Sequence, residues 1–304
     1  MVSFATEQVG QRFGPAITGF MQSTLGNLPE FFIVIFALSA GETVVAKTSL
    51  IGSLFANALL VLGIVIVVGA RAGDGLMRFG KRLPNDTTTL LLLAVFIIVI
   101  IGISVQSSAP AADHVKALSI TGAVCLLVVY FVWIASYLRG DKPRESAHEG
   151  TPGVPLTFSV VMLGISGTGA AFVSDWFIGA LDPAVKAIGI SKEFAGLVLV
   201  AIAGNAVENA TGVVLAAKGQ SDLAISVVKN SVAQIAAFLF PALVLVSLFF
   251  QHTLTFQFAP VYIGALFLTA IALWQITGDG EAAEFEGVAL IALYVVLGAF
   301  ALAD

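Results

Sequence analysis

Two short motifs place an asparagine and a glutamate three residues apart inside otherwise apolar stretches. The first, GNLPE, contains Asn27 and Glu30, and the second, GNAVE, contains Asn205 and Glu208. Residues at this spacing lie on one face of a helix. A carboxylate inside a membrane-spanning segment is costly and marks a functional site by default. We therefore expect Glu30 and Glu208 to bind an ion or a proton.

Each motif is followed by a second apolar stretch that carries further polar side chains. The complete predicted ion- and proton-binding set is Asn27, Glu30, Asn205 and Glu208, and the predicted lining residues are Gly26, Pro29, Ser49, Ser53, Asn57, Gly204, Asn230, Ser231 and Gln234. Carboxylate, amide and hydroxyl oxygens are the ligands of hard cations such as Ca²⁺. Ligands for soft metals are absent from this set, and the predicted metal ligands are Glu30 and Glu208.

The same two glutamates predict coupling to protons. Burial and a neighbouring carboxylate both favour the protonated form of a carboxyl group. A divalent cation that binds these oxygens would displace the proton. Competition between cation and proton for one site is the minimum requirement for their exchange.

The composition indicates an integral membrane protein. Of 304 residues, 58% are hydrophobic and 11% are charged, with a mean hydropathy of +1.00, whereas soluble domains contain about 25% charged residues. The net charge of −5 argues against nucleic-acid binding. The single cysteine, Cys125, excludes an intrachain disulfide and a cysteine metal cluster. We find no nucleophile with a paired base and no phosphate-binding loop, so the sequence predicts neither an enzyme nor a cofactor other than a transported ion.

Nine continuous apolar stretches are long enough to cross a bilayer as helices. They cover approximately 13–40, 44–70, 87–107, 115–138, 154–180, 191–217, 222–250, 258–276 and 283–302. Membrane-spanning strands would alternate polar and apolar residues instead. The predicted fold is therefore an all-α polytopic membrane protein.

Two polar links predict the orientation and divide the chain. The links at 71–86 and 138–153 carry seven of the 14 lysines and arginines, and two spans separate them. The positive-inside rule makes both links cytoplasmic, which also makes the N-terminus cytoplasmic and indicates a plasma (inner) membrane. The predicted halves are 1–138 and 154–304, joined by a cytoplasmic linker at 139–153, with motif helices at 13–70 and 191–250.

One ungapped offset of 178 residues aligns the two motifs. It pairs Gly26 with Gly204, and it also pairs both asparagines and both glutamates of the motifs. Five membrane crossings separate the two motif helices, and an odd number inverts direction. Inverted repeats that meet at interrupted helices are typical of secondary transporters. Pro29, Gly26 and Gly204 are the predicted interruptions. Proline removes one backbone donor and frees a carbonyl four residues earlier.

Lys229 is a further charge within the predicted spans. The offset aligns it with Ile51, so the repeat does not require it. We expect its side chain to extend to the cytoplasmic edge; the alternative is pairing with a carboxylate of the site.

In these residues the sequence resembles the calcium/cation antiporter superfamily, and most closely its Ca²⁺/H⁺ exchanger branch. That branch carries a glycine-asparagine-x-x-glutamate motif in both repeats, here GNLPE and GNAVE. The segments SLIGSLFANALLVLG and NSVAQIAAFLFPALVLV are close to the helices that follow the motifs in that branch. The resemblance extends over most of the chain.

The resemblance implies ten core helices in two inverted repeats of five. Only nine spans are predicted here, because the first half lacks a counterpart of 154–180. It implies a secondary active antiporter that exchanges a cation, Ca²⁺ first, for H⁺ by alternating access at the paired glutamates. It also implies cation and proton sites at Glu30 and Glu208, with Asn27, Asn205, Ser53 and Gln234 around them.

Two departures from the branch leave the ion open. Asn209 stands where the branch has histidine, and Asn230 stands where it has glycine. Na⁺/H⁺, K⁺/H⁺ and Na⁺/Ca²⁺ exchange are the alternatives within the superfamily. A cation channel or a non-transporting membrane scaffold is the alternative of another class. The expected partners are the transported cation, protons and the lipid bilayer, and the sequence does not predict an oligomeric state.

Overall fold

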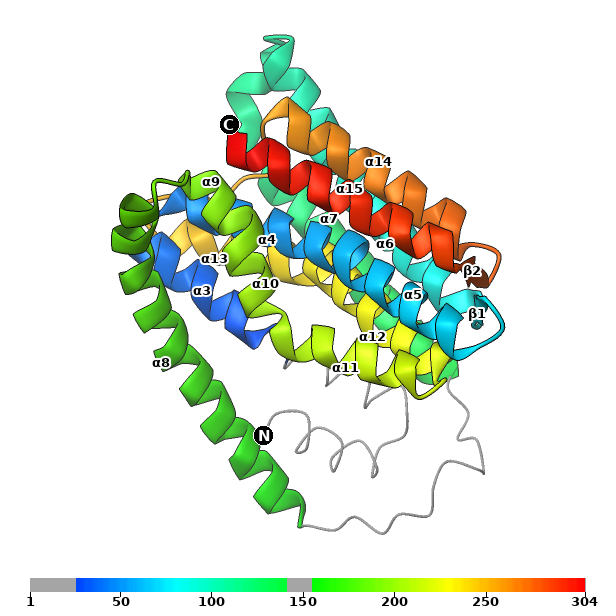
Figure 1. Ribbon diagram of the computed structural model, residues 1–304. Coiled ribbons are helices and arrows are strands. Elements are labelled where there is room, and N and C mark those ends of the chain that lie inside the picture. The colour runs from blue at the N-terminus through cyan, green and yellow to red at the C-terminus, as the bar shows by residue number, and fades with distance from the viewer. Residues whose placement is uncertain (1–25, 141–154, 304) are drawn as a thin grey trace.

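The computed structural model describes residues 26–140 and 155–303. Within these ranges the side chains of a few helical residues, Glu208 among them, lie outside the description. The described chain is almost entirely helical (Figure 1). Helices satisfy their backbone hydrogen bonds internally, which a lipid environment requires. The prediction of a helical membrane protein is confirmed, with a two-stranded ribbon as the exception.

The described part of the first half, residues 26–140, contains five α-helices, one π-helix and one 3₁₀-helix. They are α3 (Leu28–Ser39), α4 (Thr43–Phe55), the π-helix η1 (Ala56–Val61), α5 (Leu62–Ala72), α6 (Arg82–Gln106), the 3₁₀-helix η2 (Pro110–His114) and α7 (Val115–Gly140). The segments α4, η1 and α5 join into one continuous apolar helix from Thr43 to Ala72.

The second half begins with the longest described helix, α8 (Leu156–Ile188). It continues with α9 (Lys192–Phe194), the π-helix η3 (Ala195–Val200), α10 (Ala201–Gly204), α11 (Ala206–Ala217), α12 (Ser221–Gln234), the π-helix η4 (Ile235–Leu239), α13 (Phe240–Val246), the 3₁₀-helix η5 (Ser247–Phe249), α14 (Pro260–Thr277) and α15 (Glu284–Ala303).

Six helices of the described chain are long and apolar enough to cross a membrane. They are Thr43–Ala72, Arg82–Gln106, Pro110–Tyr137, Ser221–Phe249, Pro260–Thr277 and Glu284–Ala303. A bent pair, Lys192–Gly204 with Asn209–Ala217, makes a seventh if it counts as one span. The other two predicted spans, 13–40 and 154–180, overlap α3 and α8, which are not among these. The number nine stays a prediction.

The predicted offset of 178 residues also relates the secondary structures of the two motif regions. Residues 28–39 form α3 and residues 206–217 form α11, so the bounds of the two helices match. Each is followed by a tight turn at a glycine with positive φ, +78° at Gly41 and +72° at Gly219. The next helices begin at Thr43 and Ser221 and change to π-helix at 56–61 and 235–239. The sequence repeat is thus accompanied by a repeat of local structure.

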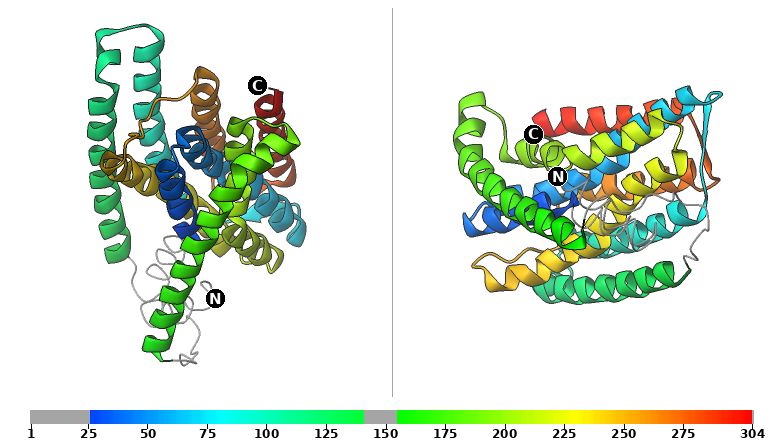
Figure 2. Two further views of the ribbon diagram at one scale, coloured as in Figure 1. Left: turned by 90° about the vertical axis from the view of Figure 1, so that its left-hand side faces the viewer. Right: turned by 90° about the horizontal axis from the view of Figure 1, so that it is seen from below.

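The motif helices pack against partners from the other half of the chain. Helix α4 lies against η3, α5 against α11 and α15, and α6 against α12 and α14. Helix α8 packs along α3 on the outside of the helix bundle (Figure 1), and Figure 2 shows the same arrangement from two further sides. Of the six long helices, Thr43–Ala72 is the most buried. The segment that carries Ser49, Ser53 and Asn57 is therefore central.

Two short strands connect links that are distant in sequence. β1 (Leu76–Arg78) pairs antiparallel with β2 (Glu281–Ala283), with Met77 opposite Ala282. Beside this ribbon, Arg71 Nη2 lies 2.6 Å from Glu284 Oε1 and forms an ion pair with it. The sequence did not predict this ribbon, whose first strand lies in the polar link at 71–86, and α6 begins at Arg82, before the apolar stretch that starts near 87. Both features involve polar residues whose structure depends on distant partners.

The close approach of α4 and η3 makes a first testable prediction. A Cβ at Gly52 would collide with the backbone of Leu197, and one at Gly196 would collide with Thr48. Small residues allow membrane helices to approach in this way. We expect Gly52→Val to lower the stability of the protein by about 3 kcal/mol, the upper end of the usual overpacking range. Thermal unfolding in detergent measures the loss.

The matched control is Gly179→Val in α8, where an added Cβ meets nothing within 4 Å. Its thermal unfolding should stay near that of the unmodified chain. Equal losses for the two variants would contradict the close approach of α4 and η3.

Candidate functional site

Two equivalent asparagines mark the helix interruptions at the centre of the candidate site. Asn27 precedes α3 with φ −83° and ψ 4°, and Asn205 separates α10 from α11 with φ −95° and ψ 5°. The helical segments on the two sides of the second interruption differ in direction by 55°. Both asparagine side chains are buried. The interruptions thus occur at the asparagines, each directly after a glycine that was predicted to interrupt its helix (Gly26 and Gly204), and not at Pro29.

Pro29 lies in the first turn of α3, where its missing donor leaves no intrahelical bond unmade. Its carbonyl oxygen accepts a hydrogen bond from Ser174 Oγ of α8 at 3.4 Å. The carbonyl that Pro29 was predicted to free belongs to Leu25, outside the described residues. Pro29 therefore starts a helix here rather than breaking one.

A hydrogen-bonded set of amides and hydroxyls joins the two halves of the chain. Asn205 Nδ2 donates to Ser53 Oγ at 2.9 Å. Asn57 Nδ2 donates to Asn205 Oδ1 at 2.9 Å and lies 3.1 Å from Ser231 Oγ. All four side chains are at most 1% exposed. Four of the predicted residues, from both halves, are thus brought into one buried network.

A second contact links the first motif to the helix that follows the second motif. Asn27 Nδ2 donates to Gln234 Oε1 at 3.4 Å. Both residues line a pocket of about 240 Å³, whose other walls are mostly apolar. This pocket lies between α3 and η4, next to the first asparagine of the site.

The Glu30 carboxylate lies against the second interruption. Its side chain is 3% exposed, and a Cβ added at Gly204 would be 2.9 Å from Glu30 Oε1. Glycine at 204 therefore leaves the space that the carboxylate occupies. The first motif's glutamate and the second motif's glycine meet, although 174 positions separate them in the sequence (204 − 30).

The remaining predicted residues have mixed positions. Asn230 is 5% exposed, and its Oδ1 has no hydrogen-bond partner among the described residues. Ser49 is buried, and within the described part of the chain its hydroxyl donates only to the carbonyl of Ala46 in its own helix, 3.2 Å away. Gly26 begins the described chain next to Asn27. The Glu208 side chain lies outside the described residues, so its distance from Glu30 stays untested.

The sequence predicted that the Lys229 side chain extends to the cytoplasmic edge of the protein. This prediction is wrong, because the side chain is buried. It is 1% exposed, and Nζ donates to Thr88 Oγ1 at 2.6 Å and to Thr277 Oγ1 at 3.2 Å. These hydroxyls belong to α6 and α14. The ammonium group is therefore directed toward these two helices, while the next residues on α12 belong to the candidate site.

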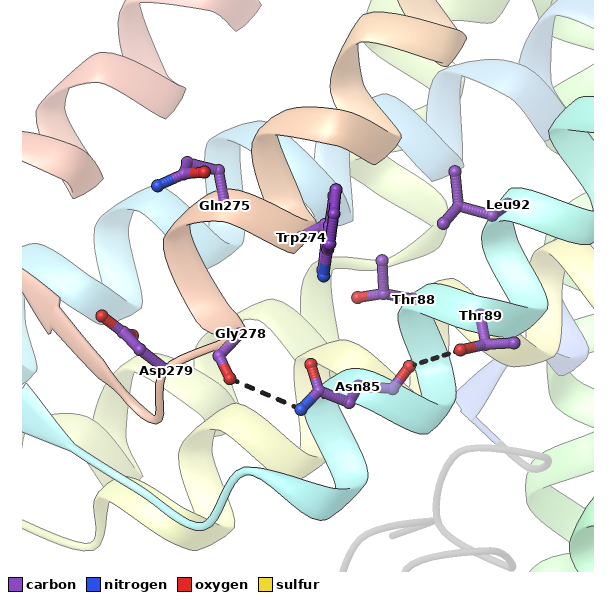
Figure 3. A pocket seen from close by; sticks show the side chains of 8 residues that line it. All are labelled: Asn85, Thr88, Thr89, Leu92, Trp274, Gln275, Gly278 and Asp279. Atoms are coloured by element: carbon purple, nitrogen blue, oxygen red, sulfur yellow. Dashed lines mark hydrogen bonds between the residues drawn. The ribbon is translucent and has the colours of Figure 1, made fainter.

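Thr88 also lines a polar pocket of about 480 Å³ near the strand ribbon (Figure 3). Figure 3 shows Asn85 Nδ2 donating to the Gly278 carbonyl, 3.4 Å away, across one side of this pocket. Among the residues whose side chains are described, none of the predicted ion-binding or lining residues contributes to its wall. The pocket is thus separate from the asparagine and glutamate set.

The oxygen chemistry of the set fits a hard cation. Amide oxygens of Asn205 and Asn230, hydroxyls of Ser53 and Ser231, and the Glu30 carboxylate are all buried. Within the described residues, which omit the Glu208 side chain, no cluster of three or more His, Cys, Asp or Glu is found. Neutral oxygens around few carboxylates are a common coordination environment for Ca²⁺.

Comparison with known proteins identifies the family. The family described as sodium/calcium exchanger protein matches residues 1–138 and 158–303. This chain belongs to the sodium/calcium exchanger protein family. The resemblance seen in the two motifs is confirmed, and the chain is an integral membrane protein of an antiporter family.

The curated relatives of this exchanger-family chain include transporters from fungi and bacteria. The vacuolar calcium ion transporter of Schizosaccharomyces pombe is 31% identical over 306 residues, which cover 98% of this chain and 74% of the relative. The Ca²⁺/H⁺ antiporter ChaA of Bacillus subtilis is 28% identical, covering 96% of this chain and 85% of that protein.

Among solved structures, native YfkE superposes with a TM-score of 0.81 at 26% identity, covering 100% of this chain and 88% of that one. The H⁺/Ca²⁺ exchanger CAX gives a TM-score of 0.70 at 14% identity, covering 99% of this chain and 81% of the other, which supports the fold alone.

Several contacts in this exchanger-family chain were not predicted. Thr88 and Thr277 as acceptors for Lys229, and Ser174 as donor to Pro29, come from helices whose packing the sequence does not specify. The Oδ1 of Asn209 is also buried without a partner among the described residues. Only Asn209 had a signal in the sequence, its place directly after the second motif.

The buried network predicts the effect of removing its central amide. Asn57→Ala deletes the donor to both Asn205 and Ser231. Loss of a buried hydrogen-bonding partner costs about 1–3 kcal/mol. We expect thermal unfolding of this variant to shift down accordingly. Asn85→Ala serves as control, because Asn85 is only partly buried and donates over 3.4 Å; a larger loss for the control would contradict the network.

Proposed function

We propose that this chain is a secondary active antiporter that exchanges a cation, Ca²⁺ first, for H⁺. It would act by alternating access at a site built from Glu30, Glu208, Asn27 and Asn205, and it would not be an enzyme. The observation that carries the proposal is the Glu30 carboxylate, 3% exposed and packed on the interruption at Gly204. The relatives named as Ca²⁺/H⁺ antiporters support the choice of ions.

Exchange follows from competition for the same oxygens. A carboxyl group with little access to water favours its neutral form, which here requires a proton on Glu30. A divalent cation replaces that proton and gains the neighbouring amide and hydroxyl oxygens. Because one site holds either the cation or protons, each must leave before the other can bind. In this account Glu208, the repeat equivalent of Glu30, is the second carboxylate that binds the cation.

The architecture that we propose is a pair of inverted repeats with nine spans. It is supported by the matching bounds of α3 and α11, the two positive-φ turns and the two π-helices at the same offset. An odd number of membrane crossings between the motifs would make the two interrupted helices run in opposite directions across the membrane. The hydrogen bonds from Asn57 to Asn205 and from Asn27 to Gln234 cross between the repeats. Alternating access would exchange such contacts as one half moves against the other.

The orientation belongs to the same proposal. The basic residues of the links at 71–86 and 138–153 support a cytoplasmic N-terminus in a plasma (inner) membrane. In this proposal a cytoplasmic linker separates the two repeats. The linker covers 139–153, and the halves cover 1–138 and 154–304.

Within the family, Na⁺/Ca²⁺, Na⁺/H⁺ and K⁺/H⁺ exchange are the second candidates. Asn209 and Asn230 keep these alternatives open, because their neutral oxygens suit a monovalent cation as well as Ca²⁺. Flux with and without Na⁺ or K⁺ gradients separates these ions. Net current without any counter-ion gradient would indicate a channel, and absence of flux for every ion would indicate a scaffold.

Removal of one carboxylate tests the exchange directly. We expect Glu30→Gln to reduce Ca²⁺ uptake driven by a pH gradient in proteoliposomes by at least about a hundredfold, because a neutral amide can neither hold the proton nor balance the cation. Glu208→Gln should have the same effect. The control is Asp113→Asn, an exposed acid outside the site, which should transport normally. Normal pH-driven uptake by both glutamine variants would refute the proposed site.

Gly204→Ala tests the contact between the repeats without changing a charge. The new Cβ would come within 2.9 Å of Glu30 Oε1 and force the carboxylate to shift. Small displacements of a binding group weaken function strongly, so we expect about a tenfold loss in apparent Ca²⁺ affinity with assembly preserved. Gly264→Ala, where nothing lies within 4 Å, should bind like the unmodified chain. Unchanged affinity in Gly204→Ala would mean that Glu30 does not bind the ion at this place.

A further inference from the structure

A polar pocket with a lysine lies away from the candidate ion site, between the start of α4 and the segment after η5. Its volume is about 380 Å³, and its wall consists of Thr43, Val44, Lys47, Gln251, His252 and Thr253. Neither the proposed antiport mechanism nor the repeat accounts for it: the offset pairs Lys47 with Ile225.

Lys47 carries a charge that no acid in the pocket balances. Its Nζ donates to Thr255 Oγ1 at 3.2 Å, and the described residues contain no ion pair of Lys47 with a carboxylate. The acid nearest in sequence, Glu42, is occupied: both of its carboxylate oxygens lie 2.7 Å from Lys192 Nζ. Two of the three ammonium donors of Lys47 therefore remain for a ligand.

The rest of the wall supplies further donors. Gln251 has an amide, His252 an imidazole, and Thr43 and Thr253 have hydroxyls that can each donate. No Asp or Glu of the described residues lines the pocket. The start of α4 adds the positive end of its dipole, which favours an anion. A tetrahedral anion with several oxygens matches this arrangement of donors around one cation.

The position of the pocket indicates the source of such an anion. Thr43 begins one membrane-crossing helix and Phe249 ends another, so the pocket opens at the level where a bilayer's headgroups lie. Beside it, Phe249 is 90% exposed, Leu248 39% and Val44 38%. An anion held next to exposed apolar side chains fits an amphiphile, whereas a free ion would gain nothing from them.

We propose that this pocket binds the phosphate group of an anionic phospholipid. The Lys47 ammonium pairs with the phosphate, His252 and the neighbouring hydroxyls donate to its oxygens, and the acyl chains lie along Phe249 and Leu248. A lipid bound there joins the turn between α3 and α4 to the segment after η5, because His252 Nε2 lies 3.9 Å from the Cβ position of Gly41. The site is independent of the ion-binding residues.

Thermal unfolding of the full chain in a neutral detergent tests this site. A ligand that binds only the folded protein raises its unfolding temperature. We expect phosphatidylglycerol to raise it more than phosphatidylcholine with the same acyl chains, and inorganic phosphate to have little effect. In Lys47→Gln the increase due to phosphatidylglycerol should fall to about half or less. Each shift is measured relative to the same variant without lipid, so a change in basal stability does not affect the comparison.

The matched control is Lys116→Gln, an exposed lysine at the start of α7, which should keep the full increase. A second variant, His252→Gln, should reduce the increase, and Lys47→Arg should preserve most of it. Equal increases in Lys47→Gln and the unmodified chain would overturn the site. An effect of inorganic phosphate as large as that of phosphatidylglycerol would overturn the assignment to a lipid.

Discussion

The burial of the Glu30 carboxylate against a helix interruption is the constraint on which the rest of the structure depends. A carboxylate that is 3% exposed in an apolar protein must be surrounded by polar atoms or be neutralised by a proton or cation. The chain leaves room for the carboxylate with a glycine at 204. The next residue, Asn205, belongs to a buried hydrogen-bonded network of amides and hydroxyls. The apolar faces of the long helices then exclude water from this cluster.

The same cluster joins the two halves of the chain. Ser53 and Asn57 come from the first half, Asn205 and Ser231 from the second, and their hydrogen bonds are between 2.9 and 3.1 Å. The π-helices that follow Phe55 and Gln234 widen the helix at equivalent places, and such segments are frequent at functional sites. An ion at this cluster would contact both halves at once, which is the geometry that alternating access requires. Lys229 is kept away from it by the hydroxyls of Thr88 and Thr277.

The sequence predicted the elements of the site better than their surroundings. The offset of 178 residues paired Asn27 with Asn205, and both lie at interruptions next to the predicted Gly26 and Gly204, because their local backbone depends on nearby residues. It could not place Pro29, which starts α3, or Lys229, whose partners lie 141 and 48 residues away. The ribbon of β1 and β2 was missed because three-residue strands acquire structure only by pairing across the chain. The function of Glu208 and the number of spans stay predictions, since the Glu208 side chain and part of the first predicted span lie outside the described residues.

The measurement that most directly tests the central claim is proton release on cation binding. Purified protein in weakly buffered detergent is mixed with Ca²⁺, and the pH change is recorded together with the amount of bound ion. The account predicts that Ca²⁺ binding releases protons in proportion to the bound ion, and that Glu30→Gln abolishes most of this release. Binding of Ca²⁺ to the unmodified chain without proton release, or equal release from Glu30→Gln, would contradict it.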